Sequence, residues 1–194
     1  MQRIVVLASG AGSLLQALID SPIRPSIAAV GSDVADASAL TRAREAGIAT
    51  FTVPVTADRA AWDEKLAARL IEFAPDYIVC AGFMRILGPA VLDSFPARII
   101  NSHPALLPAF TGAHAVRDAL AYGAKVTGCT VHVVDKGIDT GPVIAQQAVT
   151  VREDDDETSL HERIKQVERV LLVDIVQGIV ERGLVIDGRS VSFG

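Results

Sequence analysis

The sequence predicts a single α/β domain: a mostly parallel, twisted, Rossmann-like sheet of about seven strands, with helices on both faces and antiparallel strands in the C-terminal half. Three observations lead to this fold class. Apolar strand-like runs alternate with helical stripes three times within residues 4–80. The run at 4–8 is continuously apolar, as in a strand covered on both faces. Two later strand-like runs are joined by a connection too short for a crossover helix, which makes them antiparallel.

The first half of the chain, residues 1–100, is expected to hold five strands and three helices. A tight turn at 9–13 follows the first strand. Gly47 is suited to stop the second helix and Pro75 to end the third. The strands are expected at 4–8, 27–30, 48–53, 77–80 and 98–100, and the helices at 14–19, 35–46 and 59–73.

The second half, residues 101–194, is less regular and carries the longest helical stripe. A proline-rich loop runs from Asn101 to Gly112, and the acidic run at 153–157 is expected to be a solvated turn before the long helix. We expect a short helix at 114–122, antiparallel strands at 127–134 and 143–151, a long helix at 158–180 and a small hairpin around 185–189.

Composition excludes several functional classes. The 194 residues are half hydrophobic and carry a net charge of −5 without a basic run, which argues against nucleic acid or an anionic membrane as the main partner. The apolar runs are far shorter than the roughly 20 residues that span a bilayer. With a strand expected from Arg3 onward, no signal peptide is expected, and Cys80 and Cys129 fit buried, reduced thiols of a cytoplasmic protein.

A glycine turn follows the first strand and opens the first helix at residues 10–13. Small residues there let backbone N–H groups approach an anion, so the turn fits a phosphate site. It is not a P-loop, because no Gly-Lys-Ser/Thr follows. Leu15 stands where a dinucleotide fingerprint has its third glycine, although Asp33 sits where a ribose-binding acid belongs. A phosphate site, a dinucleotide site and a simple tight turn all stay open.

Three side chains at loop-like positions after apolar strands can handle a proton and an oxyanion. Asn101 can donate to a developing oxyanion, His103 can carry a proton, and Asp139 can hold that proton on the ring. If the backbone stays extended, Asn101 and His103 project from the same side. Pro104 and Pro108 stiffen the loop that follows. A histidine that merely packs, and an aspartate in an Asx-turn, are the alternatives.

The other histidines and the cysteines indicate no further chemistry. His132 lies within a strand-like run and His161 on the long helix, so both are expected to be structural, whereas His114 could line a pocket. No pair or cluster has metal-ligand spacing, so no metal is expected. No Gly-x-Ser-x-Gly elbow offers a serine nucleophile.

Several long motifs occur in the order found in one enzyme family. Residues 81–87 (AGFMRIL), 101–108 (NSHPALLP), 128–132 (GCTVH) and 139–141 (DTG) resemble the folate-dependent formyltransferases, most closely the branch that acts on glycinamide ribonucleotide in purine synthesis. The resemblance runs from residue 4 into the long helix. It implies transfer of the formyl group of 10-formyltetrahydrofolate, as cosubstrate, to the amine of glycinamide ribonucleotide, in a cytoplasmic monomer or homodimer with small-molecule partners only.

The resemblance also implies roles for individual residues. Residues 1–100 become the phosphate-binding half, and residues 101–194 the catalytic and folate-binding half. Asn101, His103 and Asp139 would be catalytic. The phosphate of the ribonucleotide would bind to Gly12, Ser13 and Leu14, and its ribose would bind to Glu168. The folate would meet Met84, Arg85, Ile86, Leu87, Leu92, Asp135, Lys136, Gly137, Ile138 and Asp139, and the substrate pocket would include Gly82, Pro104 and Pro108.

The chain departs from the family pattern in two loops. Ala11 and Leu14 stand where asparagines are common, which matters little if backbone groups bind the phosphate. Thr111 stands where a proline is common, which bears on loop rigidity rather than on chemistry.

Three other functions are compared with this one. A formyltetrahydrofolate deformylase would carry an additional domain before the first strand, and a methionyl-tRNA formyltransferase a further tRNA-binding domain. A non-catalytic dinucleotide-binding module would bind NAD(H) at micromolar levels, which the formyltransferase hypothesis does not predict.

Overall fold

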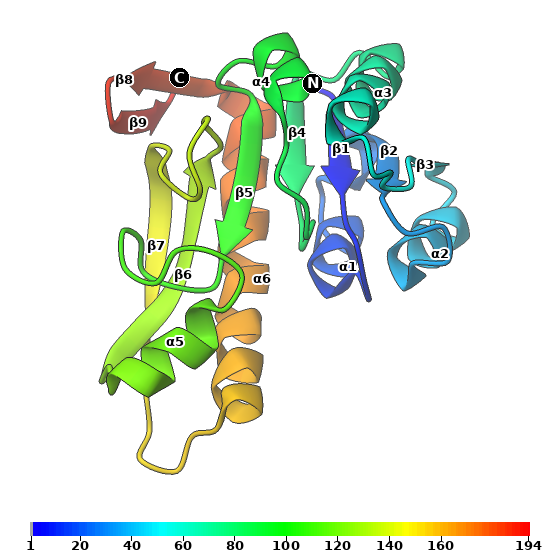
Figure 1. Cartoon of the computed structure of the whole chain (residues 1–194). Helices are drawn as coiled ribbons and strands as arrows, with labels where there is room; N and C mark the ends of the chain where they lie inside the picture. The colour runs from blue at the N-terminus through cyan, green and yellow to red at the C-terminus, as the bar shows by residue number, and fades with distance from the viewer. Residues whose placement is uncertain (1) are drawn as a thin grey trace.

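A seven-stranded sheet in the order β3-β2-β1-β4-β5-β6-β7 runs through the centre of the molecule (Figure 1). The computed structural model describes residues 2–194. The first five strands are parallel, and β6 and β7 are antiparallel to their neighbours. This confirms the predicted fold class. The strands are β1 (Ile4–Leu7), β2 (Ile27–Ser32), β3 (Ala49–Thr52), β4 (Tyr77–Cys80), β5 (Ile99–His103), β6 (Val126–Val133) and β7 (Val143–Thr150).

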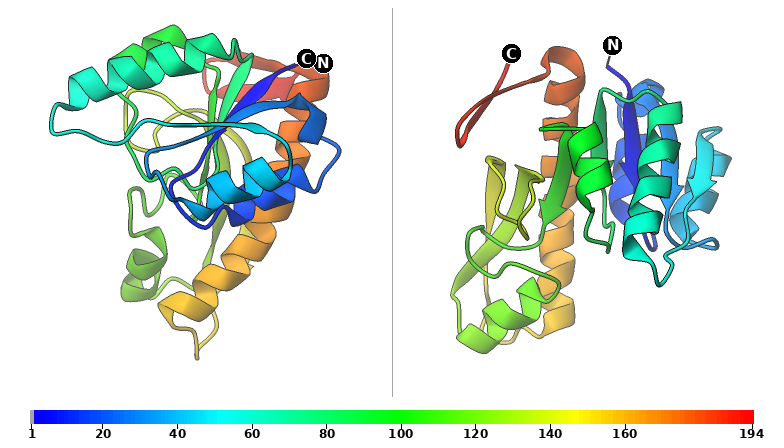
Figure 2. Two further views of the ribbon diagram at one scale, coloured as in Figure 1. Left: turned by 90° about the vertical axis from the view of Figure 1, so that its right-hand side faces the viewer. Right: turned by 45° about the horizontal axis from the view of Figure 1, so that its top comes forward.

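Helices cover both faces of the sheet (Figure 2). Side chains alternate along β1, so Ile4 and Val6 join one apolar core and Val5 and Leu7 the other. The first core contains α1 (Ser13–Ile19), α2 (Ser38–Glu45) and α6 (Glu157–Arg182), and the second contains α3 (Arg59–Glu72) and α4 (Pro89–Ser94). A third, smaller core packs α5 (Ala115–Tyr122) against β6, β7 and α6.

Helix α4 was not predicted, because its N-terminus is capped from another element. The buried carboxylate of Asp63, on α3, accepts hydrogen bonds from the backbone of Gly88 at 2.7 Å and of Ala90 at 2.8 Å. These are the orphan donors that a local cap would otherwise satisfy. A six-residue helix with a cap 25 residues away leaves no local signal beyond Pro89 at its first turn.

The acidic run before α6 is more than a solvated turn. Asp156 caps the helix by accepting from Ser159 N, and the Ser159 hydroxyl accepts from Asp156 N in return. Asp155 has a nearly buried side chain that pairs with Arg163. The expectation of a purely solvated turn was therefore wrong for Asp155. A short 3₁₀ turn (Arg24–Ser26) precedes β2, and the expected hairpin is present as β8 (Leu184–Asp187) and β9 (Ser190–Phe193).

Both cysteines are buried and free. Burial raises the pKa of the Cys80 thiol and of the Cys129 thiol to about 12, so both stay protonated at ordinary pH. Neither is therefore suited to act as a nucleophile. Across residues 2–194, no helix is both long enough and apolar enough to cross a membrane.

Candidate active site

Three segments with predicted functions meet at one edge of the sheet. The glycine turn follows β1, the segment 82–88 follows β4, and β5 itself carries residues 101–103. Because these strands are parallel, their carboxyl ends lie along the same edge, where open α/β sheets bind ligands. Strand β4 separates β1 from β5, so these two strands lie about 10 Å apart across the sheet.

His103 is buried, with a hydrogen-bond acceptor at each ring nitrogen. Its Nδ1 lies 3.4 Å from Oδ2 of Asp139, and its Nε2 lies 2.8 Å from the carbonyl oxygen of Phe110. A carboxylate and a carbonyl can only accept, so the ring satisfies both contacts when each nitrogen carries a proton. The structure therefore brings His103 and Asp139 together, as the sequence analysis expected.

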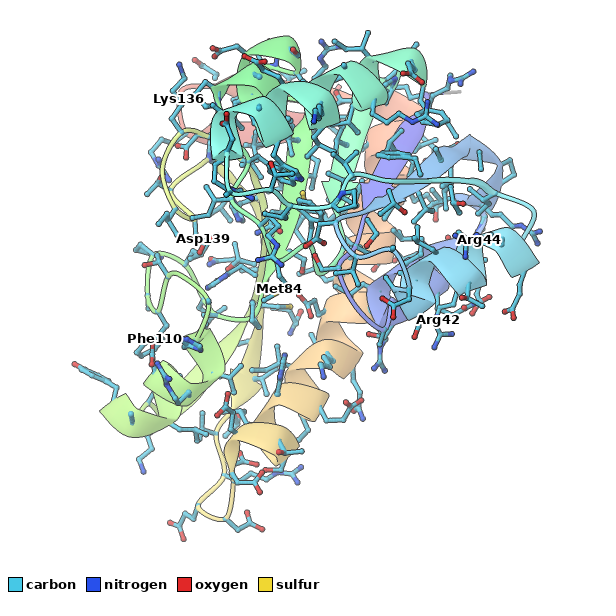
Figure 3. All side chains as sticks on the ribbon, turned by 45° about the vertical axis from the view of Figure 1, so that its right-hand side comes forward. Arg42, Arg44, Met84, Phe110, Lys136 and Asp139 are labelled. Atoms are coloured by element: carbon cyan, nitrogen blue, oxygen red, sulfur yellow. The ribbon has the colours of Figure 1, made fainter. Side chains whose placement is uncertain are left out.

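Asp139 is held in the left-handed region, with φ of 54°, by the loop between β6 and β7. Its Oδ2 also accepts from the backbone N–H of Gly112 at 2.8 Å. The His132 ring, the Gly112 amide and the His103 ring lower the pKa of Asp139 to about 2 against the effect of partial burial, so the carboxylate is ionised at neutral pH. Figure 3 shows Asp139 and Phe110 on neighbouring loops.

The Asx-turn role that was considered for Asp139 falls to Asp135 instead. Asp135 Oδ1 accepts from the backbone N–H of Gly137 at 3.0 Å and from the hydroxyl of Thr140 at 2.6 Å. These contacts close the loop locally and leave the carboxylate of Asp139 free to face the histidines.

His132 belongs to this cluster, and the expectation of a purely structural role does not account for its contacts. Its Nε2 lies 3.2 Å from Nδ2 of Asn101 and 3.6 Å from Oδ1 of Asp139. A proton on Nδ1 satisfies its contact with the carbonyl of Val133 at 3.0 Å. Nε2 lies between the Asn101 amide and the Asp139 carboxylate, so it accepts from Asn101 when it is unprotonated and donates to Asp139 when it is protonated. The missed signal is cross-strand pairing, because His132 lies directly opposite Asn101.

Ser102 points the other way, toward the long helix. Its hydroxyl donates to Oε1 of Glu168 at 2.6 Å, and Glu168 itself is buried. Burial raises the pKa of Glu168 above its ordinary value of 4.5, against the opposing hydrogen bond from Ser102. A buried carboxylate with one protein donor keeps capacity to accept from a ligand hydroxyl.

Replacing Glu168 by glutamine should stabilise the protein at neutral pH. Because folding raises the pKa of Glu168, the protonated carboxyl contributes fully to the stability of the protein below pH 4.5. This contribution is lost as the pH rises through the pKa that Glu168 has in the folded protein. Glutamine keeps the shape and cannot ionise, so Glu168→Gln should raise the melting temperature more at pH 7 than at pH 4. Thermal unfolding at both pH values tests this, with Glu181→Gln, exposed on the same helix, as the control. An equal shift at both pH values would contradict it.

The glycine turn has the geometry of a close-packed loop. Gly12 has φ of 73° and precedes α1, and a Cβ on it would lie 2.8 Å from the Cα of Ala39. Only glycine fits without strain at such a position. Ser13 and Leu14 form the first turn, whose backbone N–H groups have no partner within the helix. Among residues 2–194, no hydrogen bond or ion pair joins this turn to Asn101, His103 or Asp139.

Asp33, the acid considered for a dinucleotide ribose, is engaged elsewhere. Its Oδ2 accepts from Nε of Arg85 at 2.6 Å, and its side chain is completely buried. Leu15, at the third-glycine position, is also fully buried in the core. Both observations weaken the dinucleotide hypothesis.

Two facing segments carry the residues expected to bind folate. Met84, Ile86 and Ile138 expose 64%, 68% and 55% of their surface, although they are apolar. Figure 3 shows Met84 and Asp139 on separate segments. Lys136 reaches from the β6–β7 loop to Asp93 on α4, with the two charged atoms 3.3 Å apart. A cavity of about 600 Å³ lies beside the first segment and is lined by Val55, Arg59, Ala60, Asp63 and residues 84–89.

The remaining expected pocket residues lie at the margins of these segments. Gly82, with φ of 77°, accepts from Ser9 N through its carbonyl oxygen, which ties the segment after β4 to the segment after β1. Pro104 and Pro108 lie in the loop after β5, and Leu92 lies in α4. Among residues 2–194, no group of three or more His, Cys, Asp or Glu side chains is arranged to hold a metal ion.

The sequence and the fold are similar to those of known proteins. The chain is 51% identical to a phosphoribosylglycinamide formyltransferase of Mycobacterium tuberculosis, over 99% of this chain and 91% of that protein. It superimposes with a TM-score of 0.95 and 43% identity on a glycinamide ribonucleotide transformylase of Symbiobacterium toebii, covering 100% of this chain and 94% of that one. A formyltetrahydrofolate deformylase of Pseudomonas syringae gives a TM-score of 0.91 at 25% identity, with 65% of its length covered.

A family model described as formyl transferase matches residues 2–176. This match includes the glycine turn, the segment after β4, β5 and the loop that carries Asp139. The chain therefore belongs to the formyl transferase family.

Proposed function

We propose that the chain transfers the formyl group of 10-formyltetrahydrofolate to the amine of glycinamide ribonucleotide, yielding the N-formyl product and tetrahydrofolate. The observation that carries the proposal is the cluster of Asn101, His103 and Asp139 at the end of β5, two strands from a glycine turn. The full-length similarity to the Mycobacterium tuberculosis enzyme supports the same substrates. A cytoplasmic monomer or homodimer without nucleic-acid or membrane partners is part of the proposal.

The chemistry is an acyl transfer between two nitrogens. The neutral amine attacks the formyl carbon, a new C–N bond forms, and negative charge develops on the formyl oxygen. Asn101 gives one amide N–H to His132 and keeps the second for this oxygen. The bond from carbon to N10 then breaks, and N10 receives the proton that the attacking amine gives up.

His103 and Asp139 handle the charge of this step. A doubly protonated His103 ring would add a second donor near the oxyanion, and the ionised Asp139 would stabilise its positive charge. The same ring could donate its Nε2 proton to N10 and then take up the proton that the attacking amine gives up. Both roles require that the Phe110 carbonyl release Nε2 when the substrates bind.

The binding groups would arrange the substrates around this centre. Backbone N–H groups of Gly12, Ser13 and Leu14 would bind the phosphate, and Glu168 would bind the ribose hydroxyls. The ribose and the glycinamide arm would bridge the separation of about 10 Å between β1 and β5. The folate would lie between the segment 84–87 with Leu92 and the loop 135–139, against the exposed Met84, Ile86 and Ile138.

The proposal predicts that loss of the formyl group requires the ribonucleotide. Spectroscopic measurement of tetrahydrofolate release from 10-formyltetrahydrofolate should show turnover with glycinamide ribonucleotide and none without it. Turnover without the ribonucleotide would identify a hydrolase instead. Saturable binding of NAD(H) at micromolar levels, combined with no turnover, would favour the dinucleotide-binding module.

A further inference from the structure

We propose that Asp33 is a positioning residue of the formyl-donor site, which holds the segment 82–88 in place through its ion pair with Arg85. The inference rests on the proposed function, because the segment matters to catalysis only if it binds the folate. It assigns a role to an acid outside the catalytic cluster.

The ion pair connects strand ends that are not neighbours. Asp33 follows β2 and Arg85 follows β4, and β1 lies between those strands. Arg85 Nε nevertheless donates to Oδ2 of Asp33 at 2.6 Å. The Arg85 side chain therefore extends across the carboxyl end of β1 to reach its partner.

Asp33 and Arg85 differ in how strongly each needs the charge of the other, because they differ in burial. The Asp33 side chain is completely buried, and its Oδ1 has no hydrogen-bond partner among residues 2–194. The buried charge is therefore compensated mainly by Arg85, and removing the arginine would leave it unpaired. The Arg85 side chain is 44% exposed, so water can solvate it when the aspartate charge is removed. Changing Asp33 thus releases the segment without leaving a buried charge.

The middle of the segment needs such an anchor because only its flanks are packed, where Phe83 stacks on Trp62 and Leu87 is buried. Met84 and Ile86 are mostly exposed, so apolar burial contributes little to the conformation between these flanks. Fixing the Arg85 side chain on Asp33 therefore restrains the residue that lies between the exposed Met84 and Ile86.

Hydrogen bonds from other elements hold the backbone of the segment. Ser9 Oγ accepts from Met84 N at 2.8 Å, and Arg59 Nη2 donates to the carbonyl of Ile86 at 3.0 Å. These bonds restrain the backbone on either side of Arg85. Asp33 holds the Arg85 side chain between them, and so fixes the orientation of the segment.

The test compares Asp33→Asn with Asp36→Asn. Asp36 lies three residues away and is exposed, so both variants change the net charge equally. Asp33→Asn should raise the KM for 10-formyltetrahydrofolate about tenfold while kcat at saturation and the KM for glycinamide ribonucleotide change little. Asp36→Asn should leave all three constants unchanged. An unchanged donor KM in folded Asp33→Asn protein would overturn the inference.

Two further measurements separate positioning from direct binding and from misfolding. In a double-mutant cycle, Asp33→Asn added to Arg85→Gln should cause no additional rise in donor KM, whereas additive effects would overturn the inference. Hydrogen exchange at residues 82–88 should be faster in Asp33→Asn than in Asp36→Asn, and equal exchange would count against it. If Asp33→Asn does not fold, Asp33→Glu retains the charge but displaces the arginine, and should raise the donor KM.

The same assay distinguishes failure of this inference from failure of the proposed function. Absence of turnover by the unmodified chain would overturn the proposed function and the inference with it. Turnover by the unmodified chain, with the same donor KM in Asp33→Asn, would overturn the inference alone.

Discussion

Replacing His103 by alanine should lower kcat by about 10²–10⁴-fold, with a much smaller change in either KM. The ring is buried between Asp139 and the Phe110 carbonyl, so it is suited to carry a proton rather than to bind the bulk of a substrate. Losing it removes an interaction that is needed mainly in the transition state. Steady-state kinetics with each substrate varied in turn would measure the effect.

The control for this variant is His161→Ala. His161 lies on α6, outside the catalytic cluster, and its replacement should leave kcat unchanged. A His103→Ala enzyme with near-normal kcat would show that His103 does not take part in the chemistry. Circular dichroism of both variants would verify that their folds are intact.

Replacing Asn101 by alanine should lower kcat by about 10²–10³-fold, the typical effect of losing one oxyanion donor. The reason is geometric: His132 holds one N–H of the amide and thereby orients the other. The ground-state formyl group carries little charge, so the KM for the folate should change far less than kcat.

Asn101→Asp provides a sharper version of the same experiment. It keeps the size of the side chain but replaces the donor with an acceptor and adds a negative charge close to Asp139. We expect its kcat to be no higher than that of Asn101→Ala. Substantial activity in the aspartate variant would show that no N–H at position 101 faces the reacting oxygen.

The sequence alone was sufficient for the sheet and for the central pair of the site. Strand-like runs and glycine or proline stops are local signals, so β1 to β7 were expected close to where they occur. The alternation of β5 placed Asn101 and His103 on one side, and the loop with Asp139 does reach His103. Register within one strand and residue type are thus sufficient to suggest the chemistry.

Contacts between distant segments could not be predicted in the same way. His132 looked structural because its role depends on which residue of β5 it faces across the sheet. The cap of α4 by Asp63 and the pair between Asp33 and Arg85 join residues 25 and 52 positions apart. Such contacts depend on sheet order and on the packing of helices against it, which periodicity does not specify.

Successive side chains of β5 also face two different parts of the site. Ser102 faces Glu168 on α6, whereas the residues before and after it face the β6–β7 side. A shift of one residue in the register of β5 would turn Ser102 toward Asp139. It would turn Asn101 and His103 toward α6. Insertions or deletions within this strand should therefore abolish formyl transfer and sugar recognition together, even in a protein that still folds.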